Sequence, residues 1–256
     1  MAASDVGPLA GRTVVVTRAR AQASDLVARL SALAADVIEL PVIAIADPDD
    51  GGAALTAAAD RAVAGAYQWI VVTSANAVPR LIDALAGRRP PEGTRWAAVG
   101  TATARTLASA GITADLVPNE AVSEALVDAF PQAGPEGGSV LFARAEDVRP
   151  IVAPGLAAKG WIVDEAIAYR TVAGDPDAEA LDAARSADVI VMTSSSTVHR
   201  SVELLGAAGL PPIIVSIGPI TSAALGAVGR TPDVEAEPHN LDGVVAALLD
   251  VMADPS

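Results

Sequence analysis

The sequence predicts an α/β protein with two similar lobes, each a five-stranded parallel sheet flanked by helices. Three observations support this prediction: short β-branched runs alternate with Ala- and Leu-rich segments, the strand runs are continuously apolar, and the same blocks occur twice. Alternating strands and helices are typical of parallel βα units, and continuously apolar strands suit a sheet covered on both faces. With 256 residues, 52% of them hydrophobic, the chain can bury cores of this size.

Ten segments have the composition of strands, and between most of them apolar residues recur at helical spacing, as at Leu26, Leu30 and Leu33. Divided equally, the ten strands make two sheets of five. The expected strands are 13–17, 36–40, 69–73, 95–99, 113–117, 139–143, 161–167, 188–192, 212–217 and 233–237.

Three blocks of the chain occur twice in the same order. "IVVTSANAV" at 70–78 and "IVMTSSSTV" at 190–198 are identical at five of nine positions. "AVGTATARTLASAG" matches "SIGPITSAALGAVG" with Gly100 aligned to Gly218, and "GRTVVVTR" matches "GGSVLFAR" with Arg18 aligned to Arg144. Ordered matches at nearly equal offsets predict a duplicated domain.

Two apolar segments, 41–46 and 167–172, have no place in either expected sheet. Each precedes a stretch rich in Pro, Asp or Gly, which suits a pair of linker strands crossing between lobes. The first lobe is then discontinuous, formed by 1–40 and 173–256, and the second lobe is 47–166. We therefore expect a two-stranded linker and a cleft between the lobes.

Composition excludes several classes of function. The chain has no cysteine, which excludes disulfides, thiolate metal sites and cysteine nucleophiles. The two histidines, His199 and His239, have no metal-ligand spacing, and no dinucleotide or P-loop motif occurs, so we expect neither metal nor cofactor. A net charge of −14 and 3% aromatic residues argue against a nucleic-acid partner. A small anionic ligand remains compatible with this charge, because local groups decide its binding.

The N-terminal residues lack the basic and apolar regions of a signal peptide, and no run of about 18 apolar residues occurs. We therefore expect a cytoplasmic protein without a membrane partner.

In open α/β sheets, ligands bind at the turns that follow the carboxyl ends of strands. The turns expected here offer hydroxyls and helix-start N–H groups, which bind carboxylate or phosphate, and glycines that allow close approach. Taken singly, the Ser and Thr residues could be ordinary N-caps and the arginines solvated surface residues. Their repetition in both halves favours binding. The substrate-binding candidates are Arg18, Ser74, Gly100, Thr101, Thr103, Arg144, Ser194, Ser195, Ser196, Gly218, Pro219 and Thr221.

Pro79 indicates how the chain continues after the strand at 69–73. Proline fits the first turn of a helix capped by Asn76 better than one capped by Ser74, which leaves Ser74 outside the helix and free to reach a ligand. The serine-rich turn beginning at Ser194 is expected to make more hydrogen bonds to the ligand. Tyr169 is the one candidate proton donor, with a plain β-forming aromatic as the alternative.

Six stretches, in order, resemble the uroporphyrinogen-III synthases: the block 14–43, "IVVTSANAV", "AVGTATARTL", "AIAYRT", "IVMTSSSTV" and "SIGPITSAAL". The resemblance covers about 11–250. It implies two α/β lobes joined by a two-stranded linker, with the active site in the cleft. It also implies cyclisation of hydroxymethylbilane to uroporphyrinogen III, with loss of water and inversion of the last pyrrole ring, in haem, sirohaem or cobalamin biosynthesis. No metal or organic cofactor is implied.

The resemblance also implies roles for individual residues. Tyr169 matches the family's favoured proton donor, and a phenol stays protonated at neutral pH. Thr103 and Thr221 match its carboxylate or substrate contacts, and the remaining candidates are carried over as binding residues. Ala34 departs from the family, which often has glycine there, as Gly160 does in the other half. That turn is therefore expected to be tighter or displaced. A monomer that receives hydroxymethylbilane from hydroxymethylbilane synthase is expected.

Two other classes of protein remain open at this point. A two-lobed binding protein that captures an anionic small molecule would have the same turns, although such proteins are commonly exported and no signal peptide is seen. A regulatory module descended from the synthase fold would need an output domain, for which this chain offers no segment.

Overall fold

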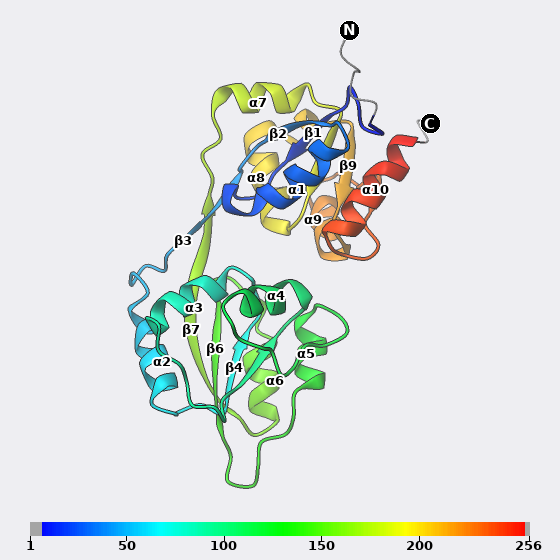
Figure 1. Ribbon diagram of the computed structural model, residues 1–256. Helices are drawn as coiled ribbons and strands as arrows, with labels where there is room; N and C mark the ends of the chain where they lie inside the picture. Colours follow the sequence, from blue (N-terminus) through cyan, green and yellow to red (C-terminus); the bar gives the residue numbers. More distant parts are fainter. Residues whose placement is uncertain (1–6, 254–256) are drawn as a thin grey trace. The chain divides into compact units, whose positions relative to one another are not determined.

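The computed structural model describes residues 7–253, with the side chains of 20–22 left aside (Figure 1). The chain divides into two compact units. Unit 1 contains the chain up to Ala44 and from Val172 onward, and unit 2 is Ile45–Thr171. One sheet of five strands belongs to each, in the orders β10-β9-β8-β1-β2 and β3-β7-β6-β4-β5.

Unit 1 is a parallel sheet covered by helices on both faces. Apolar residues of α1 and α10 pack on the face that carries Val14, Val16 and Val191, and α8 lies against Met192 on the other face, next to α7 and α9. Continuous burial of strands such as β8 follows from this double cover. The elements are β1 (Thr13–Val16), α1 (Arg20–Ala32), β2 (Asp36–Glu39), α7 (Ala178–Arg185), β8 (Val189–Met192), α8 (Ser195–Leu205), the 3₁₀ turn η1 (Ala207–Gly209), β9 (Ile213–Ser216), α9 (Pro219–Ala227), β10 (Val234–Glu235) and α10 (Leu241–Ala253).

Unit 2 repeats this architecture. Helices α2, α3 and α4 cover one face of the sheet, and α5 and α6 cover the other, where Trp69, Phe130 and Trp161 pack together. The elements are β3 (Ile43–Ala46), α2 (Ala53–Val63), β4 (Trp69–Val72), α3 (Ala77–Leu85), β5 (Arg95–Ala98), α4 (Thr101–Ser109), α5 (Ser123–Ala129), β6 (Ser139–Ala145), α6 (Val152–Ala158) and β7 (Ile162–Ala173).

The repeat predicted from the sequence extends to individual hydrogen bonds. Asp115 accepts a hydrogen bond from the Trp96 amide at 2.8 Å, and Asp233, 118 positions later, accepts one from Ile214 at 2.8 Å. Each carboxylate fixes the start of an equivalent strand, β5 or β9. Conserved placement of such bonds within one chain indicates that both units fold by the same local rules.

The predicted strand at 113–117 is wrong. Only a single bridge forms there, between Ala97 and Leu116. Its place as the fifth strand of unit 2 is taken by β3 at the opposite edge, beside β7. In unit 1 the equivalent bond from Asp233 is followed by the paired strand β10, so the Asp115 bond does not by itself explain the difference.

The segments expected to be linker strands, 41–46 and 167–172, contain the boundaries between the two units, at 44/45 and 171/172. The expectation that they have no place in either sheet is wrong. Residues 43–46 form β3, and β7 runs without interruption from Ile162 to Ala173 beside it. Strand β7 stays paired with β6 as far as Tyr169.

A register shift in β7 decides which face of the sheet Tyr169 occupies. Ala143 is opposite Ala166 and Arg144 is opposite Ile167, but Ala145 is opposite Tyr169 rather than Ala168. One extra residue in a strand changes the alternation of side chains between the two faces. Tyr169 therefore joins the core beneath α2, α3 and α4, whereas regular alternation would point it to the other face.

Ala34 adopts the left-handed conformation, with φ 66°, as Gly160 does with φ 86°. The two turns make matching hydrogen bonds, Ala35 N–H to Leu30 O and Trp161 N–H to Leu156 O. The expectation of a tighter or displaced turn at Ala34 is therefore wrong. The alanine instead keeps a conformation that costs a Cβ-bearing residue about 1 kcal/mol.

We expect Ala34→Gly to raise the free energy of unfolding by about 1 kcal/mol, because glycine adopts this φ without a steric cost. Urea denaturation followed by circular dichroism measures the change. Ala28→Gly is the matched control. Ala28 lies within α1 and is exposed, so the same substitution there should lower stability by about 1 kcal/mol. An equal decrease in the free energy of unfolding for Ala34→Gly and Ala28→Gly would contradict the prediction.

Candidate functional site

The strand order places polar turns at one edge of each sheet. In unit 1 the chain moves outward from β1 to β2 and in the other direction from β8 to β9, so the order reverses between β1 and β8. In unit 2 it reverses between β6 and β4. Ligands of open α/β sheets bind outside the carboxyl ends of strands at such a reversal. These ends are followed by Arg18 and Ser194 in unit 1 and by Ser74 in unit 2, where Arg144 lies near the end of β6.

Ser74 and Tyr169 are joined by a hydrogen bond at the carboxyl edge of unit 2. The Tyr169 hydroxyl donates to Ser74 Oγ at 2.8 Å, and the Asn76 amide donates to the same oxygen at 3.1 Å. Helix α3 begins at Ala77 with Asn76 at the N-cap position, so Ser74 lies outside the helix as predicted. Its oxygen accepts two hydrogen bonds, and that Ser74 reaches a ligand stays a prediction.

The equivalent turn of unit 1 is a helix cap. Ser194 is the N-cap of α8, its Oγ accepts from the Thr197 amide, and the Thr197 hydroxyl accepts from the Ser194 amide. Ser196 Oγ lies 2.9 Å from Ser194 Oγ, and Ser195 Oγ lies 3.5 Å from the Ile220 carbonyl oxygen. These hydroxyls are therefore used within the turn. This weighs against the expectation that the second turn makes more hydrogen bonds to a ligand.

Arg18 is largely buried and lacks a strong partner. Its Nε has no hydrogen-bond partner among the described residues. Burial lowers the pKa of its guanidinium from the ordinary value, and the charge of Asp25 on α1 acts in the opposite sense. A buried cation without a bonded anion costs free energy, so this position is suited to a carboxylate that arrives with a ligand.

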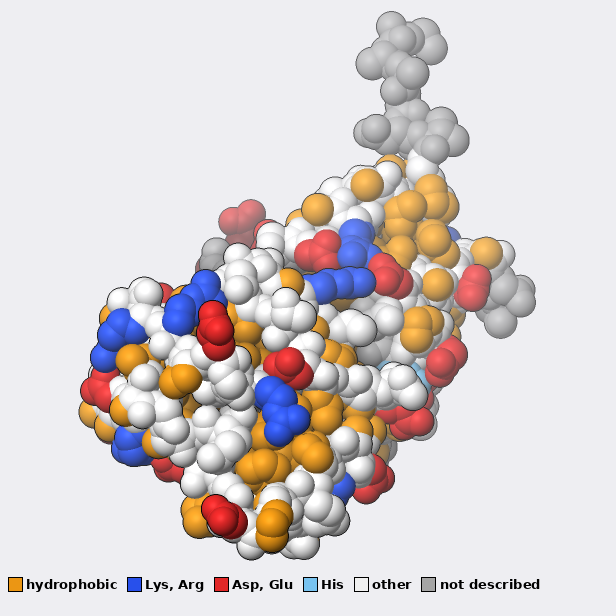
Figure 2. Space-filling view, turned by 60° about the horizontal axis from the view of Figure 1, so that its bottom comes forward, with side chains coloured by type: hydrophobic (Ala, Val, Ile, Leu, Met, Phe, Trp, Pro, Cys, Tyr) orange, Lys and Arg blue, Asp and Glu red, His pale blue; other side chains and the backbone are white. Residues whose placement is uncertain are grey.

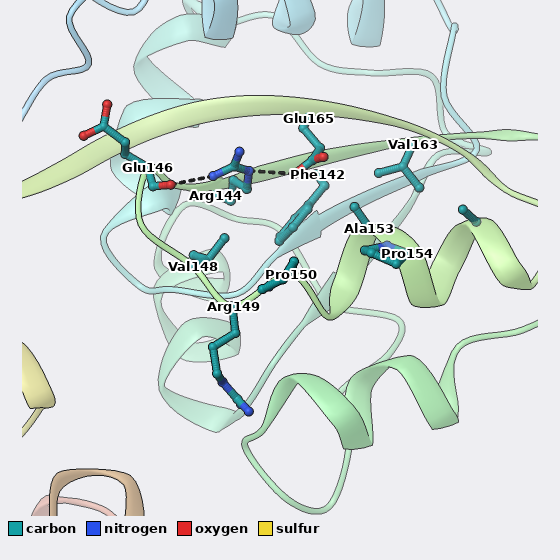
Figure 3. A pocket seen from close by; sticks show the side chains of 11 residues that line it. Phe142, Arg144, Glu146, Val148, Arg149, Pro150, Ala153, Pro154, Val163 and Glu165 are labelled. Carbon is teal, nitrogen blue, oxygen red and sulfur yellow. Dashed lines mark hydrogen bonds and ion pairs between the residues drawn. The ribbon is translucent and has the colours of Figure 1, made fainter. Parts of the chain in front are cut away.

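Arg144, which the sequence repeat aligns with Arg18, has an ion pair and two hydrogen bonds within its own unit. Its Nε lies 2.7 Å from Glu165 Oε2, although that N–H is not aligned for a hydrogen bond. Its Nη1 donates to the carbonyl oxygens of Ala145 and Glu146 at 2.8 and 2.7 Å, and Figure 3 shows the guanidinium between these groups. The repeat thus has one satisfied arginine and one unsatisfied arginine.

A pocket of about 470 Å³ surrounds Arg144 on the α6 side of the unit 2 sheet (Figure 3). Its second arginine, Arg149, is paired with Glu124. Phe142 in its wall belongs to the core under α5 and α6, on the face opposite Tyr169. An anion entering this pocket would have to displace existing carboxylates. Arg144 and Tyr169, both predicted site residues, are therefore separated by the sheet.

The Gly-x-x-Thr turns start α4 and α9. Gly100 and Gly218 are the N-cap residues, without a side-chain cap, and the exposed Thr101 and Pro219 follow at the first helical positions. Thr103 and Thr221, two residues further on, are each 4% exposed. Neither threonine hydroxyl has a hydrogen-bond partner within the described part of the chain.

The two glycines make room for the chain's own loops. A Cβ at Gly100 would lie 2.6 Å from the Ala121 Cβ, and one at Gly218 would lie 3.2 Å from Cγ of His239. Ala121 and His239 are 118 positions apart, the same offset as the glycines. Sequence reasoning did not select His239. Its imidazole is beside the start of α9, with Nδ1 2.7 Å from the Ala236 carbonyl oxygen. The one sequence signal that could have placed His239 beside Gly218 is the repeat offset of 118 positions.

The surface carries no large basic area on the face shown in Figure 2, where Lys and Arg side chains are dispersed among Asp and Glu. Within residues 7–253, no cluster of three or more His, Asp or Glu side chains could hold a metal ion. No helix in that range is long and apolar enough to cross a membrane.

The fold and the carboxyl-edge turns define a duplicated α/β protein suited to a small anionic ligand. The family model described as uroporphyrinogen-III synthase HemD matches residues 24–246, and the chain belongs to this family. A uroporphyrinogen-III synthase of Synechococcus elongatus is 36% identical, over 94% of this chain and 96% of the relative.

Two solved structures share the fold. A uroporphyrinogen III synthase mutant from Thermus thermophilus has a TM-score of 0.62 and 20% identity, covering 94% of this chain and 99% of the other. A uroporphyrinogen-III synthetase from Helicobacter pylori has a TM-score of 0.62 and 17% identity, with the same coverage.

The contrast between the two arginines predicts opposite effects on stability. Arg18→Met removes an unpaired buried cation and should raise the free energy of unfolding by up to about 1 kcal/mol. Arg144→Met leaves Glu165 and two carbonyl groups without their partner and should lower it by about 1–2 kcal/mol, a value reduced for partial exposure of the pair. Urea denaturation of both variants tests this. Similar losses would show that Arg18 is as well satisfied as Arg144.

Proposed function

We propose that this chain is a uroporphyrinogen-III synthase, which cyclises hydroxymethylbilane to uroporphyrinogen III with loss of water and inversion of the last pyrrole ring. Membership of the family supports the reaction. The single structural observation that supports it best is the hydroxyl pair Tyr169–Ser74 at the carboxyl edge of unit 2. Departure of the substrate hydroxyl needs a proton donor, and a buried phenol in contact with a strand-end turn can supply one.

Carboxylate binding is the second requirement. Hydroxymethylbilane has acetate and propionate groups along its length, so the protein must hold anions without a strongly basic surface. Arg18, the Thr103 and Thr221 hydroxyls and the amide groups at the starts of α4 and α9 meet this requirement. Arg144 does not, because Glu165 already neutralises it.

We propose further that one substrate is held in a cleft by turns of both units, with 41–46 and 167–172 as the connections between them. Holding both ends of a flexible chain favours attack on the substituted carbon of the last ring over the spontaneous closure. We also propose that the protein is a cytoplasmic monomer and that it receives its substrate from hydroxymethylbilane synthase.

Product analysis tests the reaction. Purified protein is supplied with hydroxymethylbilane, the product is oxidised, and the porphyrin isomers are separated. We expect predominantly the type III isomer, because the enzyme must act before spontaneous closure gives type I. The enzyme-free reaction is the control. Type I alone in both samples would refute the proposed function.

Thr103→Ala and Thr221→Ala should each raise KM about tenfold, since each removes a hydroxyl proposed to contact a substrate carboxylate. Stability should change little because neither hydroxyl is bonded within the described protein. Thr106→Ala in α4 is the control; its hydroxyl is bound to the Ala102 carbonyl oxygen, within its own helix. Steady-state kinetics measures the loss of a substrate contact, and thermal unfolding shows whether stability has changed instead. Wild-type KM values in both variants would exclude these contacts.

A further inference from the structure

We propose that Ser74 is the group that gives its proton to the departing hydroxyl, and that Tyr169 acts behind it by resupplying that proton. The inference rests on the proposed function and deepens it, because it assigns the direct contact with the leaving group to a different residue. The hydrogen bond between the two hydroxyls supports it.

The hydrogen-bond inventory of Ser74 leaves its own proton unassigned. A serine oxygen has two acceptor positions and one hydrogen. The acceptor positions are filled by the Tyr169 hydroxyl at 2.8 Å and the Asn76 amide at 3.1 Å. The Ser74 hydrogen is used by no acceptor among the described residues. It is therefore available to a substrate oxygen.

Burial assigns the outer position to the serine. Tyr169 is 6% exposed, within the core beneath α2, α3 and α4. Ser74 is half-buried, in a loop between β4 and α3. A substrate oxygen that reached the phenol directly would have to enter this packed region, whereas the serine presents its hydroxyl at the strand end. The register shift in β7 holds the phenol on this side of the sheet.

The second copy of the turn supports the same conclusion by contrast. Ser194 accepts from the Thr197 amide and is part of a capping box, with Ser196 as its hydroxyl neighbour. No tyrosine lies behind it. The offset of 126 positions that aligns Arg144 with Arg18 aligns Tyr169 with Ile43. Only unit 2 therefore combines a serine outside the helix with a phenol that can replace its proton.

The proton transfer balances without another reactant. The pyrrole nitrogen lone pair expels the hydroxyl, the carbon–oxygen bond breaks, and its electron pair leaves with the oxygen. That oxygen takes the Ser74 proton and departs as water, while Ser74 takes the Tyr169 proton in the same step, so no serine alkoxide is formed. The methylene carbon that lost the hydroxyl then bonds to the substituted carbon of the last ring, and the bond from that carbon to its neighbouring methylene bridge breaks. The freed bridge bonds to the unsubstituted carbon of the same ring, and the proton lost from that carbon returns to the phenolate.

The experiment compares five variants in steady-state kinetics with isomer analysis. Ser74→Ala should lower kcat about 100-fold with little change in KM, as loss of a general acid does. Ser74→Thr keeps a hydroxyl and should recover most of that rate. Tyr169→Phe should lower kcat about tenfold, because Ser74 keeps its proton but loses its source. The double variant Ser74→Ala/Tyr169→Phe should be no slower than Ser74→Ala, because both residues act in one step.

Tyr67→Phe is the matched control for the phenol. Tyr67 is the chain's other tyrosine, and its hydroxyl is bound to Arg61 and Asp164 at the start of β4, at the opposite edge of the same sheet. It should keep wild-type kcat. Thermal unfolding confirms that each variant is folded. A proton inventory in mixtures of light and heavy water should be curved for the wild type and linear for Tyr169→Phe.

Four results would overturn the inference, and the first three are a Ser74→Ala kcat near that of wild type, a loss confined to KM, and losses that multiply in the double variant. If Tyr169 touches the leaving group itself, Tyr169→Phe will be slower than Ser74→Ala, which also overturns it. Formation of type I isomer alone by the wild-type protein would refute the proposed function instead, so the two failures are distinguishable.

Discussion

Parallel pairing is the constraint on which the rest of this structure depends. Because neighbouring strands run in one direction, their carboxyl ends and the turns that follow them lie at a single edge of each sheet. The order reversal then leaves two of these turns without a helix crossing over them, between β1 and β8 and between β6 and β4. This arrangement determines the positions of the polar residues discussed as functional, apart from those facing the Arg144 pocket.

Duplication supplies two copies of this edge, and the copies have diverged in how their polar groups are satisfied. Arg144 is neutralised by Glu165, while Arg18 is buried without an equivalent bond. Ser194 caps its helix, whereas Ser74 is held by a phenol and by one backbone amide. The backbone bonds are conserved between units, as at Asp115 and Asp233. In these two pairs the divergence thus lies in side chains near the strand ends.

Much of this could be predicted from the sequence, because the determining signals are local. Short β-branched runs located nine of the strands, the ordered repeats aligned both sets of turns, and Pro79 placed Ser74 outside its helix. The register shift in β7 could not be predicted, since Ala168 and Tyr169 have no sequence feature that marks an extra residue. The satisfaction of Arg144 depends on Glu165 in a neighbouring strand, a tertiary pairing that local sequence does not reveal. The segment 113–117 has the same carboxylate-to-amide bond as the segment that contains β10, so this local feature does not tell a strand from a single bridge.

The unsatisfied groups are the basis on which a chain with net charge −14 is proposed to bind a polycarboxylate. Repulsion from distant surface carboxylates is weakened by solvent and salt, whereas a desolvated guanidinium and unbonded helix-start amides act at contact distance. In the proposed function Arg18 provides the charge, and the buried Thr103 and Thr221 hydroxyls, at equivalent places in the two units, provide directed contacts. On that proposal a few groups left incomplete by the fold recognise the ligand, and the overall charge of the surface can remain strongly negative.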